Sequence, residues 1–126
     1  MKKIITTEKA PAPIGPYNQA VLLGNLLYTS GQIAINPKTG ALEIDDIEKE
    51  TKLVMENLKA ILEEAGMTFE NVIKSSIFVS DMHNFSKINK VYGQYFNAET
   101  APARETVEVA NLPKFVNVEI SVIASS

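Results

Sequence analysis

The last quarter of the chain, residues 101–123, constrains the fold most strongly because its side chains alternate between apolar and polar. Every second residue from Val116 to Val122 is apolar, and polar residues lie between them. Segment 104–109 alternates in the same way, and the short run Asn-Leu-Pro-Lys separates the two segments. An alternation with a period of two is typical of strands with one buried face, so we expect two final strands.

Two such strands joined by a short connection predict an antiparallel hairpin centred on Leu112–Pro113. In that register Thr106 lies opposite Glu119, and Arg104 lies one step further along the same polar face. An arginine, a hydroxyl and a carboxylate would then share one patch. The simplest interpretation is a solvent-facing strand surface with an ordinary ion pair, since most polar strand faces are wet. A functional site is the alternative.

The length and the charge of the chain restrict its class. A chain of 126 residues fits one domain spanning 1–126. Its formal net charge of −3, with Lys2-Lys3 as the only adjacent basic pair, argues against nucleic acid as the main partner, because binding phosphates calls for a basic face. The absence of cysteine excludes disulfides and thiolate metal sites. With no secretory signal and no run long enough to span a bilayer, we expect a cytoplasmic protein.

The first third of the chain predicts short strands around a rigid segment. We expect a strand over 3–7 and two more over 18–23 and 26–29, the last two joined by a tight turn at Gly24-Asn25. Between the first and the second of these strands, Ala10–Pro16 holds three prolines and a glycine, which excludes helix and regular ladder pairing. We expect this segment to lie against the body of the domain.

The middle of the chain predicts two helices separated by a strand. The first begins at Asp45-Asp46, where Asp45 and Glu48 resemble a capping box, and it ends at Gly66. A β-branched run over 72–80 predicts a strand, and a second helix follows over about 84–96. The order of elements indicates an α+β domain, with both helices on one face of a mixed sheet.

Few side chains in this sequence suggest chemistry. His83 is the only histidine, and without partners other than Asp81 it is interpreted as a surface residue. There is no nucleotide-binding glycine loop, no recognisable serine nucleophile and no clustering of metal ligands. The candidates that remain are Arg104, Glu119, Thr106, Tyr17, Asn89 and the break at Ser30-Gly31.

The sequence resembles the reactive intermediate deaminase (Rid) family of enamine/imine deaminases along essentially its whole length. The resemblance is carried by Ala12-Pro-Ile-Gly-Pro-Tyr-Asn-Gln19, Thr29-Ser-Gly-Gln32, Asn36-Pro-Lys-Thr-Gly40, Pro102-Ala-Arg-Glu-Thr-Val-Glu-Val109, and Leu112-Pro-Lys with Val118-Glu-Ile120. It implies a chorismate-mutase-like α+β fold assembled as a homotrimer, with active sites between subunits. It also implies hydrolysis of 2-aminoacrylate and 2-imino acids, released by pyridoxal-phosphate enzymes, to 2-oxo acids and ammonia.

The resemblance assigns roles to the candidate residues. It places the carboxylate-binding arginine at Arg104 and the catalytic glutamate at Glu119, with Tyr17 as a further catalytic residue. It places the substrate-binding positions at Ser30, Gly31, Asn89 and Thr106. Thr106 stands where the family has a cysteine, which removes thiol chemistry from this chain but not the hydrolysis.

Physical chemistry agrees with these roles. An arginine fork fixes a small carboxylate by two charge-assisted hydrogen bonds. The imine carbon is already electrophilic, so the reaction needs an aligned water and a proton carrier, such as a glutamate, and we expect no metal and no cofactor. Two alternatives remain: a regulatory protein that binds a 2-oxo acid without catalysis, and an endoribonuclease, which the acidic balance disfavours.

Overall fold

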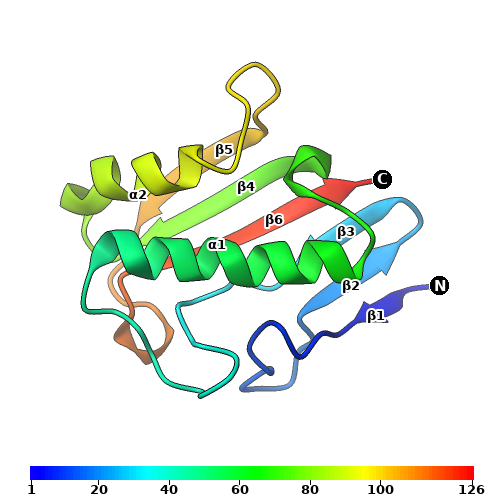
Figure 1. Cartoon of the computed structure of the whole chain (residues 1–126), viewed down its shortest axis with the longest axis horizontal. Helices are drawn as coiled ribbons and strands as arrows, with labels where there is room; N and C mark the ends of the chain where they lie inside the picture. The colour runs from blue at the N-terminus through cyan, green and yellow to red at the C-terminus, as the bar shows by residue number, and fades with distance from the viewer.

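The chain folds around one six-stranded sheet in the order β1–β2–β3–β6–β4–β5 (Figure 1). The computed structural model describes all residues from 1 to 126. Neighbouring strands are antiparallel except β4 and β5, which are parallel, so the sheet is mixed as predicted. The elements are β1 (Lys3–Ile5), β2 (Ala20–Leu23), β3 (Leu26–Thr29), α1 (Ile47–Glu64), β4 (Val72–Val79), α2 (Phe85–Gly93), β5 (Ala103–Glu108) and β6 (Val118–Ser125), with short 3-10 turns at Phe69–Asn71, Met82–Asn84 and Pro113–Phe115.

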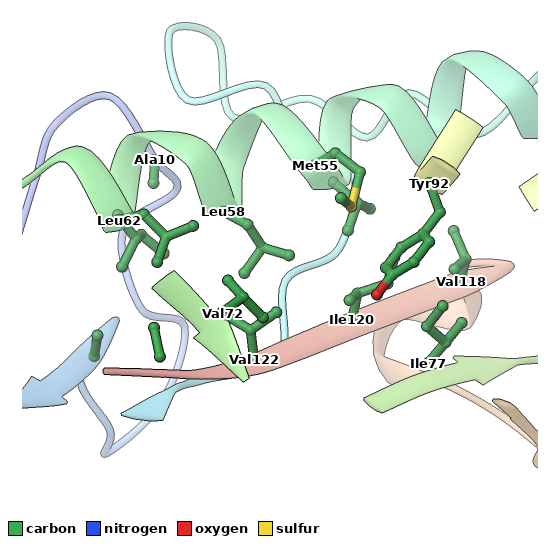
Figure 2. Close-up of a cluster of buried hydrophobic side chains, with 14 of the residues drawn as sticks. Ala10, Met55, Leu58, Leu62, Val72, Ile77, Tyr92, Val118, Ile120 and Val122 are labelled. Carbon is green, nitrogen blue, oxygen red and sulfur yellow. The ribbon is translucent and has the colours of Figure 1, made fainter. Parts of the chain in front are cut away.

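Both helices lie on the same face of the sheet, which confirms the predicted α+β arrangement (Figure 1). The alternation in β6 explains this packing, because Ile120 and Val122 are buried beneath the helices while the residues between them face the other way. Leu58 and Leu62 of α1 point down toward Val72 and Val122 of the sheet (Figure 2). Neither helix is both long enough and apolar enough to cross a bilayer.

The ends of α1 are fixed by local hydrogen bonds. The Asp46 carboxylate accepts from the Lys49 N–H at 2.9 Å, so the predicted capping box of Asp45 with Glu48 is wrong and the N-cap lies one residue later. Gly66, with φ of +75°, follows the helix, and the Met67 N–H donates to the Leu62 carbonyl at 2.9 Å. This is the glycine C-terminal cap that the sequence predicted.

The predicted hairpin of the last two strands is wrong. β5 and β6 are not neighbours, because β4 lies between them and pairs with both. Their connection does not make a tight turn: Leu112 and Val116 are buried against Ile33 and Ile35 in a small separate cluster. β5 reaches β4 by a parallel crossover through α2, which leaves both edges of β6 free to pair with β3 and β4.

The true registers also separate the predicted polar patch. Thr106 pairs with Ile77, which faces the helices, whereas Glu119 pairs with Phe78 on the opposite face. Arg104 pairs with buried Ser75, so it shares the helix side with Thr106. The prediction that Arg104, Thr106 and Glu119 lie together on one face of one chain is therefore wrong.

A β-bulge near the start of β4 sets which of its residues face the helices. The register with β6 shifts between Val72 and Lys74, so that Ile73 is an extra residue and is 50% exposed. Val72 is buried on the helix side before the bulge, and Ser75 and Ile77 are buried there after it. The bulge thus places Lys74 on the face of the sheet that carries no helix.

Leu58 offers a direct test of this packing. It is fully buried in the middle of α1, so Leu58→Ala should lower the free energy of unfolding by about 2–5 kcal/mol through lost burial and a residual cavity. Urea denaturation measures this difference. The control is Lys59→Ala on the exposed side of the same helix, which should change stability by no more than about 0.5 kcal/mol. Equal stability of the two variants would contradict the proposed role of the α1 face.

Candidate functional site

A cleft of about 330 Å³ opens on the side of the protein where the proline-rich segment meets the start of β6. Its volume is at the lower end of the range for small-molecule sites, roughly 300–1,000 Å³. Four residues predicted for the site line it: Tyr17, Ser30, Gly31 and Glu119. Its apolar walls include Pro11, Pro13, Ile14, Ile33, Ile35 and Pro113.

Glu119 is the only ionisable carboxylate in the cleft lining, and it is half-buried. No side chain or backbone group of the chain donates a hydrogen bond to it, and burial raises its pKa above the ordinary value. A carboxyl group with a raised pKa and free lone pairs in a cleft is suited to taking up and releasing a proton.

Gly31 allows this carboxyl group to approach the backbone. A Cβ atom at position 31 would lie 2.7 Å from Glu119 Cδ and 2.9 Å from its Oε2, which is closer than real Cβ contacts. Any side chain at Gly31 would therefore displace the Glu119 side chain. The break in regular pairing after β3 places Gly31 there, and the residue before it is held because the Ser30 hydroxyl donates to the Asn18 carbonyl at 2.5 Å.

Tyr17 forms part of the proline-rich wall. Its hydroxyl accepts a hydrogen bond from the Ile14 N–H at 3.3 Å, and its ring packs on Gly15, where a Cβ atom would lie 3.3 Å from the ring. The Tyr17 N–H donates to the Gly15 carbonyl at 2.8 Å. The tyrosine thus folds back on its own segment, and 45% of it is exposed at the cleft.

The second group of predicted residues lies on the helix side of the sheet. Arg104 of β5 donates through Nη1 to the Asn89 Oδ1 of α2 at 2.7 Å. Its guanidinium carbon lies 5.1 Å from the centre of the Tyr92 ring and 5.6 Å from that of Phe85, within cation–π range. None of the ion pairs in the structure includes Arg104, so its charge has no carboxylate partner.

Buried hydroxyl groups lie around this arginine. The Tyr92 hydroxyl donates to Ser75 Oγ at 2.9 Å, and burial raises the pKa of Tyr92. Thr106, one step along β5 from Arg104, has a buried hydroxyl with no hydrogen-bond partner. An unsatisfied buried donor is rare in native proteins and suggests that a group outside the chain completes its bonding.

The structure therefore brings the predicted residues together in two groups and not in one. Tyr17, Ser30, Gly31 and Glu119 form the cleft group. Arg104, Asn89 and Thr106 form the arginine group, none of which lines the cleft. The two groups lie on opposite faces of the sheet, so one chain alone does not complete a site that needs both.

Sequence reasoning missed the aromatic support of Arg104. Phe85, Asn89 and Tyr92 follow one another at intervals of four and three residues, which places them on one side of α2. From the sequence this segment predicts a helix, but not that its aromatic rings support Arg104. The signal that could have indicated this support is the polar Asn89 between the aromatic residues Phe85 and Tyr92 on the same side of the helix. His83, in contrast, is at the surface as predicted, since 97% of its side chain is exposed.

Comparison with known proteins agrees with the fold. Residues 7–126 match the family model described as Endoribonuclease L-PSP. A RutC family protein of Pyrococcus horikoshii is 52% identical over 98% of both chains, and a 2-iminobutanoate/2-iminopropanoate deaminase of Salmonella typhimurium is 47% identical, again over 98% of both. The solved structure of Escherichia coli TdcF with bound serine is 44% identical over 98% of each chain, with a TM-score of 0.93.

The structure is that of a small α+β protein with a cleft of small-molecule size, and the matches are specific to one family. The chain belongs to the Endoribonuclease L-PSP family, also known as the RutC or Rid family. The family includes imine deaminases. Most of the similar relatives have only the general name RutC family protein.

The raised pKa of Glu119 predicts a pH effect with a definite sign. The folded protein holds the Glu119 proton more tightly than the unfolded chain does, because burial penalises the charged form. The contribution of this group to stability is therefore present in acid and declines as the pH rises from the ordinary glutamate value of 4.5 through the folded pKa. Glu119→Gln, which does not titrate, should gain stability relative to the natural protein across that interval.

Urea unfolding of both proteins at a series of pH values measures this difference, and an NMR titration of the Glu119 carboxyl carbon gives the pKa directly. Burial also raises the pKa of Glu50, but this residue is present in both proteins, so its effect cancels in the comparison. A stability difference that does not change with pH would show that Glu119 titrates at its ordinary value.

Proposed function

We propose that this protein hydrolyses reactive enamines and imines of the 2-aminoacrylate and 2-imino acid class to 2-oxo acids and ammonia. The proposal is carried by one observation: a proton-accepting carboxyl group without partners, Glu119, lines a cleft with largely apolar walls, while the same chain holds an arginine without a carboxylate partner, Arg104. The deaminase activity of the 47% identical Salmonella relative supports it.

In this proposal Arg104 binds the substrate carboxylate. Its guanidinium is held in place by Asn89 and by the aromatic rings of Tyr92 and Phe85, which leaves the remaining N–H groups for a ligand. A planar, preorganised guanidinium loses little freedom on binding a carboxylate in a bidentate manner. The unsatisfied Thr106 hydroxyl is a further donor on the same side of the sheet.

Glu119 acts on the water. As the water oxygen bonds to the imine carbon, the π electrons of the C=N bond move to nitrogen and the Glu119 carboxylate takes a proton from the water. The carboxyl group then gives that proton to nitrogen, which forms the carbinolamine. The regenerated carboxylate takes the proton of the carbinolamine hydroxyl and passes it to the amino nitrogen, so the C–N bond breaks as the C=O bond forms and ammonia leaves. Tyr17 and Ser30 are hydroxyl groups in the same cleft that can bond to the reacting oxygen or nitrogen. No metal or cofactor takes part.

The two groups of residues meet between copies of the chain. Arg104 and Glu119 lie on opposite faces of the sheet, so a site with both needs the arginine group of one copy beside the cleft of another. The face of the sheet that carries no helix exposes Leu26, Tyr28 and Val107, which is apolar area available for such a contact. Contact between two different patches closes into a ring, and we propose a homotrimer with one site at each interface.

A regulatory protein that binds a 2-oxo or amino acid without catalysis is the second candidate. It is favoured by the TdcF structure, which holds serine as a bound ligand. The same Arg104 serves both functions, but Glu119 would be dispensable for binding alone. Glu119→Gln should slow turnover more than it weakens product binding if the protein is a deaminase, and an equal loss of both would favour the regulatory role. The name of the family model suggests RNA cleavage, which the net charge of −3 disfavours.

Removal of the arginine tests the proposed role in binding. Arg104→Ala loses two charge-assisted hydrogen bonds to the substrate, or about 3–6 kcal/mol, so kcat/KM should fall by roughly 10²- to 10⁴-fold. A dehydratase with serine supplies 2-aminoacrylate, and the release of 2-oxo acid is followed with and without the protein. Lys87→Ala, which removes an exposed cation from α2, is the control and should keep full activity. Normal turnover by Arg104→Ala would contradict the proposal.

Mixing two inactive variants tests the site between copies. Arg104→Ala keeps the cleft, Glu119→Gln keeps the arginine group, and neither alone should be active. After the two are unfolded, mixed and refolded together, about one interface in four joins an intact cleft to an intact arginine group, so about a quarter of the natural activity should return. Refolding each variant alone is the control. A mixture that stays inactive would show that each chain uses its own two residues.

A further inference from the structure

The proline-rich wall of the cleft has almost no hydrogen bonds of its own to the rest of the protein. The segment 8–16 lies in no helix or strand, and its bonds within 12–17 are internal. Ala10 is the one residue of this wall that packs in the main core, near Leu62 at the end of α1 (Figure 2). A single apolar contact fixes a point of the segment but does not fix its direction.

Gln19 supplies the missing attachment. Its side chain is buried, with 2% of the residue exposed, and it uses all of its hydrogen-bonding groups on residues 7–11. The Oε1 atom accepts from the Thr7 N–H at 2.7 Å. The two N–H groups of Nε2 are shared among three carbonyl oxygens, those of Thr7 at 3.0 Å, Ala10 at 3.2 Å and Pro11 at 2.9 Å.

The backbone of the same residue reaches the opposite side of the cleft. The Gln19 carbonyl accepts from the Ser30 N–H at 2.9 Å, and Ser30 directly precedes Gly31, which lies against Glu119. Gln19 therefore connects the proline-rich wall by its side chain to the floor of the cleft by its backbone. No other residue bonds to both.

We propose that Gln19 is a positioning residue that sets the width of the cleft. It holds the 7–11 segment, and with it the wall that ends at Tyr17, at a fixed distance from Ser30 and Glu119. This role rests on the proposed function, because a wall held at the correct distance orients the substrate between Tyr17 and Glu119. The polar atoms of the Gln19 side chain are bonded to residues 7–11, so its role is to position the wall and not to react.

Substitution of the carboxamide tests this role. Gln19→Met keeps the size of the side chain but removes all four bonds, and Gln19→Asn keeps a carboxamide on a shorter stem. The first readout is hydrogen exchange of the free protein. We expect exchange in residues 7–17 to become about tenfold faster or more in Gln19→Met, and by an intermediate factor in Gln19→Asn, with no change in β6. The second readout is kinetic: KM for a 2-imino acid should rise at least about fivefold, and by more than kcat falls.

Asn71 provides a matched control for lost stability. Its side chain donates to the Ser125 carbonyl at 3.1 Å and accepts from the Thr68 N–H at 2.9 Å, at the far end of the sheet from the cleft. Asn71→Leu should lower the melting temperature while the exchange of 7–17 and the KM stay unchanged. A purely structural role for Gln19 predicts that Gln19→Met and Asn71→Leu behave alike in both readouts.

The outcomes separate this proposal from the proposed function. If the natural protein hydrolyses imines and the Gln19 variants keep the natural exchange rates and KM, the positioning role is wrong while the function stands. If the natural protein does not hydrolyse imines, the proposed function is wrong. Hydrogen exchange then still tests Gln19, because natural exchange rates over residues 7–17 in Gln19→Met would show that Gln19 does not hold the wall. If Gln19→Met does not fold, Gln19→Asn supplies both readouts.

Discussion

The structure depends on the central position of β6. This strand pairs with β3 on one edge and β4 on the other, and alternate side chains along it are buried beneath the helices. Its start is held by Glu50 of α1, whose buried carboxylate accepts from the Asn117 N–H and from the Asn117 side chain, each at 2.8 Å. Burial raises the pKa of Glu50, and these hydrogen bonds oppose the shift. The clamp fixes where β6 begins, and thereby where Glu119 enters the cleft.

Buried polar side chains hold the irregular segments around the cleft. Such segments cannot satisfy their backbone groups in a ladder, and buried backbone groups need partners. The Asn57 amide donates to the Ile33 carbonyl at 3.3 Å and to the Ile35 carbonyl at 3.1 Å, as Gln19 does for the proline-rich wall. The apolar core therefore fixes the sheet and the helices, while buried amides and Glu50 fix the walls between which a ligand would lie.

Much of the fold could be predicted from the sequence because its signals are local. The alternation in β6, the glycine turn after β2 and the cap at Gly66 each depend on a few neighbouring residues. Strand order is different, because it depends on which distant segments meet. The Leu112–Pro113 connection has the composition of a turn, but Leu112 is buried against Ile33 and Ile35, about eighty residues earlier, and no local pattern records that contact.

The residues of the candidate site could be predicted from the sequence, but their arrangement in space could not. The resemblance to the Rid family selected Tyr17 and Glu119, which do lie in one cleft, and Arg104 with Asn89, which are bonded to each other. The sequence could not show that these pairs face opposite sides of the sheet, because that depends on the parallel register of β5 with β4. Gln19 was visible as a motif residue, but its four bonds appear only in three dimensions.

The bulge at Ile73 sets which face of the sheet each later residue of β4 occupies, because it takes Ile73 out of the alternation. Val72, before it, and Ser75, after it, both face the helices, although three positions separate them. Deletion of Ile73 would remove an exposed side chain together with the extra residue, so Val72 and Lys74 would become consecutive partners of Ala124 and Ile123 in a regular ladder. Every later residue would keep its partner and its face, with Lys74 on the side without helices and Ile77 in the core. Deletion of a residue farther along the strand, such as Ile77, would instead carry neighbouring residues to the wrong face or slide the pairing with β5 and β6 by one residue. The bulge is in this way a place where β4 can lose a residue without a change of register in the rest of the strand.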